Sequence, residues 1–198
     1  MIHSDYIRLN RILAGVIFLI SFIVYFDTMA PTVSYWDCGE FIAVSHTLGV
    51  PHPPGSPFFL LVGRIATMLP INADIAFRVN ILSPLTSALA VMFLYLIIVQ
   101  VVVHWRGKLE SAHDALVAFG GAIVGSMVFA FTDSHWFNAV EAEVYAFSTF
   151  FTAIVVWLIL HWSEKADEKG HERYILIIAY MIGLATGLHL LNLLTLPF

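Results

Sequence analysis

Charged residues are scarce in this sequence. Only 12% of the 198 residues are charged and 60% are hydrophobic, whereas a soluble domain is about one-quarter charged. The composition therefore excludes an ordinary soluble domain and predicts an integral membrane protein. The nine lysines and arginines are scattered and the net charge is −5, so the sequence has no basic stripe of the kind that binds nucleic acid.

Cysteine and the familiar nucleotide-binding motifs are also lacking. Cys38 is the only cysteine, so no disulfide can form within the chain. The sequence contains no Walker loop, no Rossmann glycine fingerprint, no G-x-S-x-G and no H-E-x-x-H. Nucleotide chemistry therefore has no support in the sequence.

What the sequence has instead is long apolar runs, which predict an all-α, multi-pass membrane helical bundle. A helix needs about 20 residues to cross a hydrocarbon core of ~30 Å. The sequence stops inside the last apolar run, and we interpret it as the N-terminal portion of a longer protein. The predicted spans are 12–29, 79–105, 115–132, 145–162 and 174–198.

Two shorter segments, 38–48 and 58–69, are predicted to be interfacial helices in the first external loop. The second has only twelve residues, contains Arg64 and ends at Pro70, which is too short for a span. If it lies at the interface, the two basic loops that follow the second and fourth spans, at 106–108 and 165–173, are both cytoplasmic, as the positive-inside rule requires. The N-terminus is then cytoplasmic and both acidic loops are external.

The first predicted span has an alternative interpretation as a cleaved signal peptide. Arg8 and Arg11 fit the basic start of such a peptide, but "DTMAPT" offers no small-x-small cleavage site. We therefore interpret this span as an uncleaved anchor.

The first external loop contains "WDCGEF", in which Asp37 and Glu40 are three residues apart. On a helix, both carboxylates share one face and can point at one ligand. The alternative is a capping box, in which Asp37 caps the helix and Glu40 closes the box. "VPHPPGSP" follows, and its four prolines fix a rigid turn around His52. His52 is a candidate phosphate or metal ligand, or an ordinary surface histidine.

The second external loop contains "NAVEAEVYAF", with Glu141 and Glu143 two residues apart. Such a pair can complete a divalent-cation site made of oxygen ligands. The alternative is that these are ordinary acidic residues at the end of a loop, with no ligand. On the last span, His189 and Asn192 form a polar pair. An intramembrane polar pair marks a candidate site, although a helix–helix hydrogen bond explains it equally well.

Two arginines, Arg64 and Arg78, fall near the predicted outer interface. Their default role is to extend toward lipid phosphates. In a polar pocket, an arginine can instead hold a substrate phosphate through paired hydrogen bonds.

Three segments together resemble the GT-C glycosyltransferases, and in particular bacterial proteins related to the animal transmembrane O-mannosyltransferase. They are "WDCGEFIAVSHTLGVPHPPGSP", "WFNAVEAEVYAFSTFF" and "GLATGLHLLNLLTLP". The first carries most of the resemblance, because W-D-x-G-E followed by H-P-P-G is rarely found by chance. The resemblance implies a GT-C-like fold and transfer of a hexose from a polyprenyl-phosphate carrier at the outer membrane surface.

The resemblance also implies roles for individual residues. The key acidic residue of the first external loop corresponds to Asp37, with Glu40 as its neighbour. Some members complete a divalent-cation site, Mg or Mn, with an acidic pair in the second external loop, and others use no metal. Glu141 and Glu143 occupy that place as E-x-E rather than the more usual D-x-D. No other cofactor is expected.

The predicted function is therefore that of an inverting hexosyltransferase, for which mannose is one candidate sugar, in the bacterial inner membrane with its site on the periplasmic side. The acceptor is expected to be a protein Ser or Thr hydroxyl, or a glycan. The leaving phosphate is expected to bind His52, Arg64 or Arg78. Two alternatives stay open at this point: an ion-coupled multi-pass transporter, and a non-catalytic lipid-binding membrane subunit.

Overall fold

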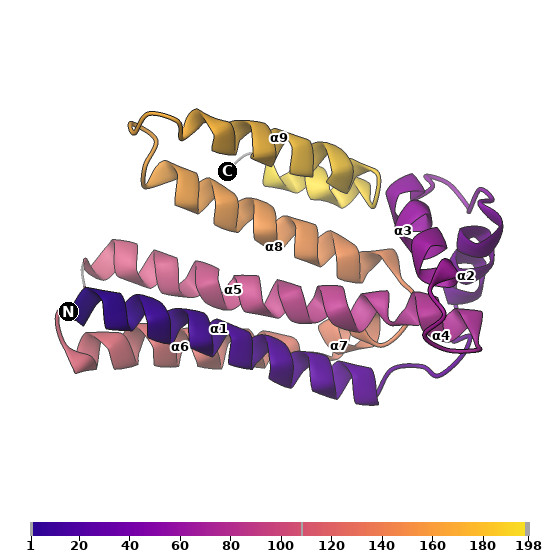
Figure 1. Cartoon of the computed structure of the whole chain (residues 1–198), viewed down its shortest axis with the longest axis horizontal. Helices are drawn as coiled ribbons and strands as arrows, with labels where there is room; N and C mark the ends of the chain where they lie inside the picture. The colour runs from indigo at the N-terminus through magenta and orange to yellow at the C-terminus, as the bar shows by residue number, and fades with distance from the viewer. Residues whose placement is uncertain (1, 108, 197–198) are drawn as a thin grey trace.

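The computed structural model describes residues 2–107 and 109–196, and the regular secondary structure within them is entirely helical. The longer helices run side by side along the molecule, and short helices gather near one end (Figure 1). The predicted all-α membrane bundle is thereby confirmed. The longer helices are α1 (Ile2–Asp27), α5 (Leu82–Arg106), α6 (Ala112–Ala130), α8 (Val144–Ser163) and α9 (Glu172–Thr186).

Four segments in the described part of the chain are long and apolar enough to cross a membrane. Each overlaps one of the first four predicted spans, with ends that differ by one to seven residues. In the second, the short helix α4 leads directly into α5, so that the apolar stretch begins earlier than residue 79. The four segments are Asp5–Asp27, Ile75–Arg106, Ala112–Ala130 and Val144–Ser163.

The fifth predicted span, 174–198, is not a single helix. α9 has 15 residues, which corresponds to about 22 Å of helix and is less than a full crossing. The chain breaks at Gly187 and continues as the 3₁₀ helix η1 (Leu190–Thr195), which lies back alongside α8 and α9 (Figure 1). Residues 197–198 of this prediction lie outside the described part.

The shorter helices lie at the end of the bundle where α1 ends and α5 begins (Figure 1). Two of them correspond to the predicted interfacial segments 38–48 and 58–69, and α3 is too short to be a span. They are α2 (Cys38–Thr47), α3 (Pro57–Met68), α4 (Ile75–Asn80) and α7 (Asp133–Ala139).

α5 is the central helix of the bundle and packs against α1, α6 and α8. Small side chains make these contacts close: Ala88, Ala118 and Ala122 are completely buried. Alanine at a helix interface lets two backbones approach each other, which favours association where lipid supplies no hydrophobic driving force. These packed helices hold the loops that connect them at both ends of the bundle.

A second apolar cluster holds the short helices against α8. The ring of Phe59 in α3 meets Phe41 of α2 at 5.4 Å and Phe147 of α8 at 5.7 Å, both edge to face. Edge-to-face aromatic pairs add specific attraction to the burial of their surface. This cluster fixes α2 and α3 beside the start of α8, where both acidic loops meet.

Candidate functional site

Asp37 directly precedes α2 and has an exposed side chain. The residue is already helical (φ −77°, ψ −8°), and its side chain makes no capping hydrogen bond. A capping residue normally has extended backbone, so that its side chain can reach back to the first turn. The capping interpretation of Asp37 is therefore wrong, and its exposed carboxylate is available to a ligand.

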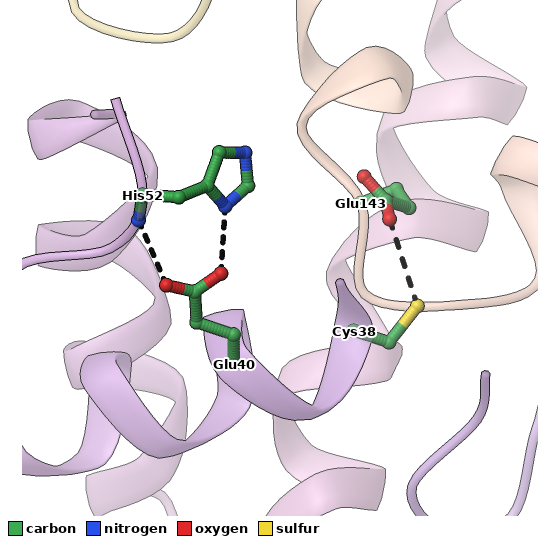
Figure 2. Close-up of polar contacts among 4 residues, drawn as sticks. All are labelled: Cys38, Glu40, His52 and Glu143. Carbon is green, nitrogen blue, oxygen red and sulfur yellow. Dashed lines mark hydrogen bonds and ion pairs between the residues drawn. The ribbon is translucent and has the colours of Figure 1, made fainter. Parts of the chain in front are cut away.

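Glu40 is bound to His52 through both of its oxygens. Its Oε1 accepts a hydrogen bond from the backbone N–H of His52 at 2.7 Å, and its Oε2 lies 2.6 Å from Nδ1 of the ring, as Figure 2 shows. This hydrogen bond raises the pKa of His52, and nearby Asp37 and Glu143 add to the effect. The same contact lowers the pKa of Glu40. Glu40 therefore does not close a capping box; it orients the imidazole ring of His52 and favours its charged form.

Glu143 immediately precedes α8 and is buried, at 6% exposure. The thiol of Cys38 donates to its Oε1 at 3.8 Å (Figure 2). Burial raises the pKa of Glu143 to about 7, and the charges of Asp37 and Glu141 contribute in the same direction. Burial also raises the pKa of the Cys38 thiol, so this cysteine is a hydrogen-bond donor and not a thiolate nucleophile.

Glu141 has a different partner. The hydroxyl of Ser34 donates to its Oε2, while its Oε1 is buried and has no hydrogen-bond partner among the described residues. Glu141 and Glu143 thus bind separate groups of the first loop. Together, these two contacts join the first external loop to the second, over more than one hundred residues of sequence.

A pocket of about 150 Å³ opens between these loops and the break after α9. Its polar lining consists of Asp37, His52, Ser56, Glu143, Tyr145 and His189. A wider hollow, of about 370 Å³, lies beside Lys169 in the loop after α8 and Arg173 in the first turn of α9. That hollow contains no acidic cluster, so we place the candidate site at the smaller pocket.

One group in the described part of the chain is close enough to share a cation. Single ligand atoms of Asp37, Glu40 and His52 all lie within 4.8 Å of one another. Both Glu40 oxygens already bind His52, so a cation would compete with that ion pair. Glu141 and Glu143, the predicted cation ligands, are not in this group, and metal binding by them stays a prediction.

Neither predicted phosphate-binding arginine lines the pocket. Arg64 donates to the carbonyl of His46 at the end of α2. Arg78 donates to the carbonyls of Asn72 and Thr67, at 2.6 and 2.8 Å. The structure thus uses these hydrogen bonds to tie α2, α3 and α4 together, and phosphate binding by the two arginines stays a prediction.

The polar pair near the end of the chain divides into two roles. His189 lines the pocket, with its ring 5.2 Å from that of Tyr145. Asn192 is buried and accepts hydrogen bonds from Ser148 and Thr152 of α8, both at 3.1 Å. Asn192 is therefore the helix–helix contact that the sequence allowed, whereas His189 belongs to the candidate site.

Three residues at this site are not predicted from the sequence as site residues: Ser34, Cys38 and Tyr145. The lone Cys38 indicates only that no disulfide forms within the chain. Cys38 lies next to Asp37 and Tyr145 lies two residues after Glu143. Their positions beside the two acidic motifs were thus the available signal, whereas nothing in the sequence singled out Ser34.

Known proteins match most of the chain. The protein O-mannosyl-transferase TMEM260 of Mus musculus is 28% identical over 162 residues, covering 82% of this chain and 21% of the relative. The protein O-mannosyl-transferase tmem260 of Dictyostelium discoideum is 30% identical over an alignment of 197 residues, covering 92% and 22%. The chain thus spans about a fifth of the length of these relatives. No solved structure shows significant similarity to it.

A family model supports the same relationship. The model of the protein O-mannosyl-transferase TMEM260 N-terminal domain matches residues 37–198. The match begins at Asp37 and includes both acidic loops, the H-P-P turn and His189. The chain therefore belongs to the family defined by the TMEM260 N-terminal domain, among O-mannosyltransferase-related proteins.

Proposed function

We propose that this chain is the N-terminal part of a membrane glycosyltransferase that transfers a hexose from a polyprenyl-phosphate carrier to an acceptor hydroxyl. Mannose is the proposed sugar and a protein Ser or Thr the proposed acceptor, following the names of the relatives. One observation carries the proposal: the carboxylate of Asp37, which makes no capping hydrogen bond, shares a pocket with His52 and Glu143. That pocket lies at the end of the membrane-spanning helices, where a lipid-linked sugar meets water.

Asp37 is the proposed general base. The acceptor oxygen forms a bond to C1 of the sugar while the bond from C1 to the phosphate oxygen breaks. The acceptor proton moves to Asp37, and the polyprenyl phosphate leaves with the electron pair of the broken bond. Attack from the face opposite the phosphate inverts the configuration at C1.

His52 is the proposed donor to the leaving phosphate. Its ring is held by Glu40 at Nδ1, which leaves Nε2 for the ligand. A charged donor aimed at the oxygen where negative charge develops stabilises the transition state. Arg64 and Arg78 are secondary candidates, since each still has guanidinium N–H groups beyond those that bind backbone carbonyls.

A divalent cation, Mg or Mn, is a further part of the proposal. The buried Oε1 of Glu141, which has no partner among the described residues, is an available oxygen ligand, and the carboxylate of Glu143 lies near it. A bound cation would supply positive charge to the leaving phosphate. Asp37, Glu40 and His52 perform their proposed roles without it.

The proposed location is the inner membrane of a bacterium, with the pocket on the periplasmic side. The two loops that form the pocket contain no Lys or Arg between residues 27 and 56 or between 133 and 143. External loops characteristically lack these residues.

The test is sugar transfer by purified full-length protein, with polyprenyl-phosphate mannose as donor and a Ser/Thr peptide as acceptor. Asp37→Asn should reduce turnover by the ~10²–10⁴ that a general base contributes. The variant should stay folded, because the Asp37 side chain makes no capping bond. Transfer by folded Asp37→Asn at the wild-type rate would remove Asp37 as the base.

The same assay separates the two alternatives. A transporter or a lipid-binding subunit would show no transfer by the wild-type protein, and Asp37→Asn would then change only transport or lipid binding. The acidic residues lie at the start of α2 and just before α8, and both of these helix starts are at the end of the long helices and not midway along them (Figure 1), which favours the transferase.

A further inference from the structure

His189 reaches the pocket because the break after α9 is anchored on the start of α3. The backbone N–H of Phe58 donates to the carbonyl of Gly187, and the hydroxyl of Ser56 donates to the carbonyl of Leu188, both at 2.9 Å. A side chain at Gly187 would place its Cβ 3.1 Å from the Cβ of Phe58, so this close approach favours glycine. The next residue, His189, lines the pocket beside Ser56.

The segment after His189 is held equally firmly. Asn192 accepts from Ser148 and Thr152, and it donates to the carbonyls of Ala185 and His189 at 3.0 Å. All four hydrogen bonds of a primary amide are thereby satisfied. The ring of His189 therefore sits on a backbone that is fixed on both sides, as a ligand-binding group requires.

The hydrogen bond at Nδ1 defines the proton position on His189. Nδ1 accepts from the backbone N–H of Leu191 at 3.2 Å, so this nitrogen carries no proton. A neutral imidazole then carries its proton on Nε2 and donates there. His189 thus contributes a hydrogen-bond donor to a pocket whose other polar groups include the acceptors Asp37 and Glu143.

This combination suits a hydroxyl better than an anion. A hydroxyl can donate to a carboxylate and accept from an imidazole N–H at the same time. A phosphate inside the pocket would instead lie close to the carboxylate of Asp37, and two negative charges at short range repel each other.

The size of the pocket agrees with a small ligand group. Its volume of about 150 Å³ is below the roughly 300–1,000 Å³ of pockets that enclose drug-sized molecules. A complete lipid-linked sugar cannot fit, but part of a sugar can. The ring of Tyr145, against which His189 packs, adds an apolar wall of the kind that a sugar face can contact.

We propose that this pocket binds the hydroxyls of the transferred sugar, with Nε2–H of His189 as donor and the buried carboxyl of Glu143 as acceptor, while Asp37 stays available to the acceptor hydroxyl and the phosphate lies outside the pocket on the His52 side. The proposal rests on the proposed function. It adds a sugar-binding residue and separates the sugar position from the phosphate position.

Two substitutions separate ligand binding from the structural role of His189. His189→Asn keeps an oxygen acceptor for the N–H of Leu191, since asparagine caps well, but it lacks the donor at Nε2. His189→Gln keeps an amide donor farther along the side chain and loses the acceptor near the backbone. His113→Asn, at an exposed position at the start of α6, is the matched control.

The experiment measures binding of two lipids to full-length protein in nanodiscs, with thermal unfolding recorded for each variant. For His189→Asn, we expect affinity for polyprenyl-phosphate mannose to fall roughly threefold to tenfold, the usual effect of losing one hydrogen bond between neutral groups. Affinity for polyprenyl phosphate, which has no sugar, should not change. His189→Gln should retain more of the affinity, and His113→Asn all of it.

Two results would overturn the sugar-binding role. An equal loss of affinity for both lipids would mean that His189 binds phosphate. Unchanged affinity for both, with a lower unfolding temperature, would mean that His189 only caps η1. If the wild-type protein transfers mannose in either case, the proposed function survives and only the sugar position is wrong. If the wild type neither transfers mannose nor binds its carrier, both proposals fail together.

Discussion

Two carboxylates only three residues apart have different environments in this protein. Asp37 has no capping bond and is exposed, whereas Glu40 is bound to His52 through both oxygens. A group whose lone pairs are already occupied is a poor base, because it must give up a hydrogen bond to accept a proton. At the residue scale, we therefore regard Asp37 as the catalytic candidate and Glu40 as the residue that positions His52.

Glu40→Gln tests this positioning role. The hydrogen bond to Glu40 is the largest cause of the raised pKa of His52, followed by the charges of Glu40, Asp37 and Glu143. The charged form of His52 is lost as pH rises through its pKa. Glu40→Gln should lower that pKa, so the activity of the variant should begin to fall at a lower pH than that of the wild type. Turnover at neutral pH should fall by less than in Asp37→Asn. Glu110→Gln, at an exposed position, is the control.

The measurement is the rate of sugar transfer by purified full-length wild type and Glu40→Gln as a function of pH between pH 6 and 9. The ion pair is complete only above the pKa of Glu40 and below that of His52, and it weakens on either side. If the activity of wild type and of Glu40→Gln falls at the same alkaline pH, Glu40 does not control the charge of His52.

Glu143→Gln makes a prediction about stability. Burial raises the pKa of Glu143 from 4.5 to about 7, so the folded state binds this proton more tightly than the unfolded state does. Binding of this proton therefore adds to the free energy of unfolding at low pH. The contribution is lost as pH rises from about 4.5 through 7. Glutamine has no such proton. The wild type should therefore lose stability relative to Glu143→Gln between pH 5 and pH 8.

Unfolding temperatures at the two pH values, recorded in EDTA to remove bound cations, provide the measurement. Glu164→Gln, at the exposed other end of α8, should follow the wild type at both. A constant difference between wild type and Glu143→Gln across this range would mean that Glu143 titrates as an ordinary surface carboxyl.

At the scale of elements, the pair α2 and α3 depends on one close contact. A Cβ at Gly63 of α3 would lie 2.9 Å from the Cβ of Ser45 in α2, and Ser45 is fully buried. Gly63→Ala should therefore push the two helices apart and destabilise the protein by about 1–3 kcal/mol, the usual cost of overpacking.

Gly121→Ala is the matched control for this substitution. Gly121 lies in α6 with no neighbouring atom within 4 Å of an added Cβ. Alanine there should be neutral or slightly stabilising, because it is the better helix former. Thermal unfolding of the two variants measures the difference, and equal stabilities would show that the α2–α3 contact tolerates a methyl group.

Sequence patterns located most helices but not their ends or breaks. Apolar runs of sufficient length predicted α1, α5, α6 and α8. The mean hydropathy of a window of about 20 residues changes little when single residues in it are polar. The end of α9 escaped this reasoning. Its continuation is as apolar as a helix, and the chain breaks at Gly187 because Phe58 and Ser56 bind the carbonyls there, which is a tertiary contact.

At the scale of the whole molecule, the orientation in the membrane is open to direct test. The loops that form the pocket and the loops after α5 and α8 lie at opposite ends of the bundle (Figure 1). We expect single cysteines at Asn72 and Ser134 to react with a membrane-impermeant reagent from outside, and a cysteine at Glu110 not to react. All three positions are exposed.

These cysteines are introduced into a background without Cys38, in intact cells and again after permeabilisation. Permeabilisation should make the cysteine at position 110 reactive, which shows that it is accessible but on the inner side. Reaction at position 110 in intact cells, with none at 72 and 134, would reverse the orientation and place the pocket in the cytoplasm.

The amino-acid sequence by itself determined that this is a helical membrane protein and which loops carry its reactive groups. Both follow from local properties: the length of apolar runs, the distribution of charge, and the prolines around His52. The partners of those groups were decided only by the tertiary structure. Ser34 meets Glu141 and Cys38 meets Glu143 across 107 and 105 residues, and His189 joins them from the break after α9. Such contacts depend on how α2, α3 and α8 pack around Phe59, and no pattern within one segment can contain that information.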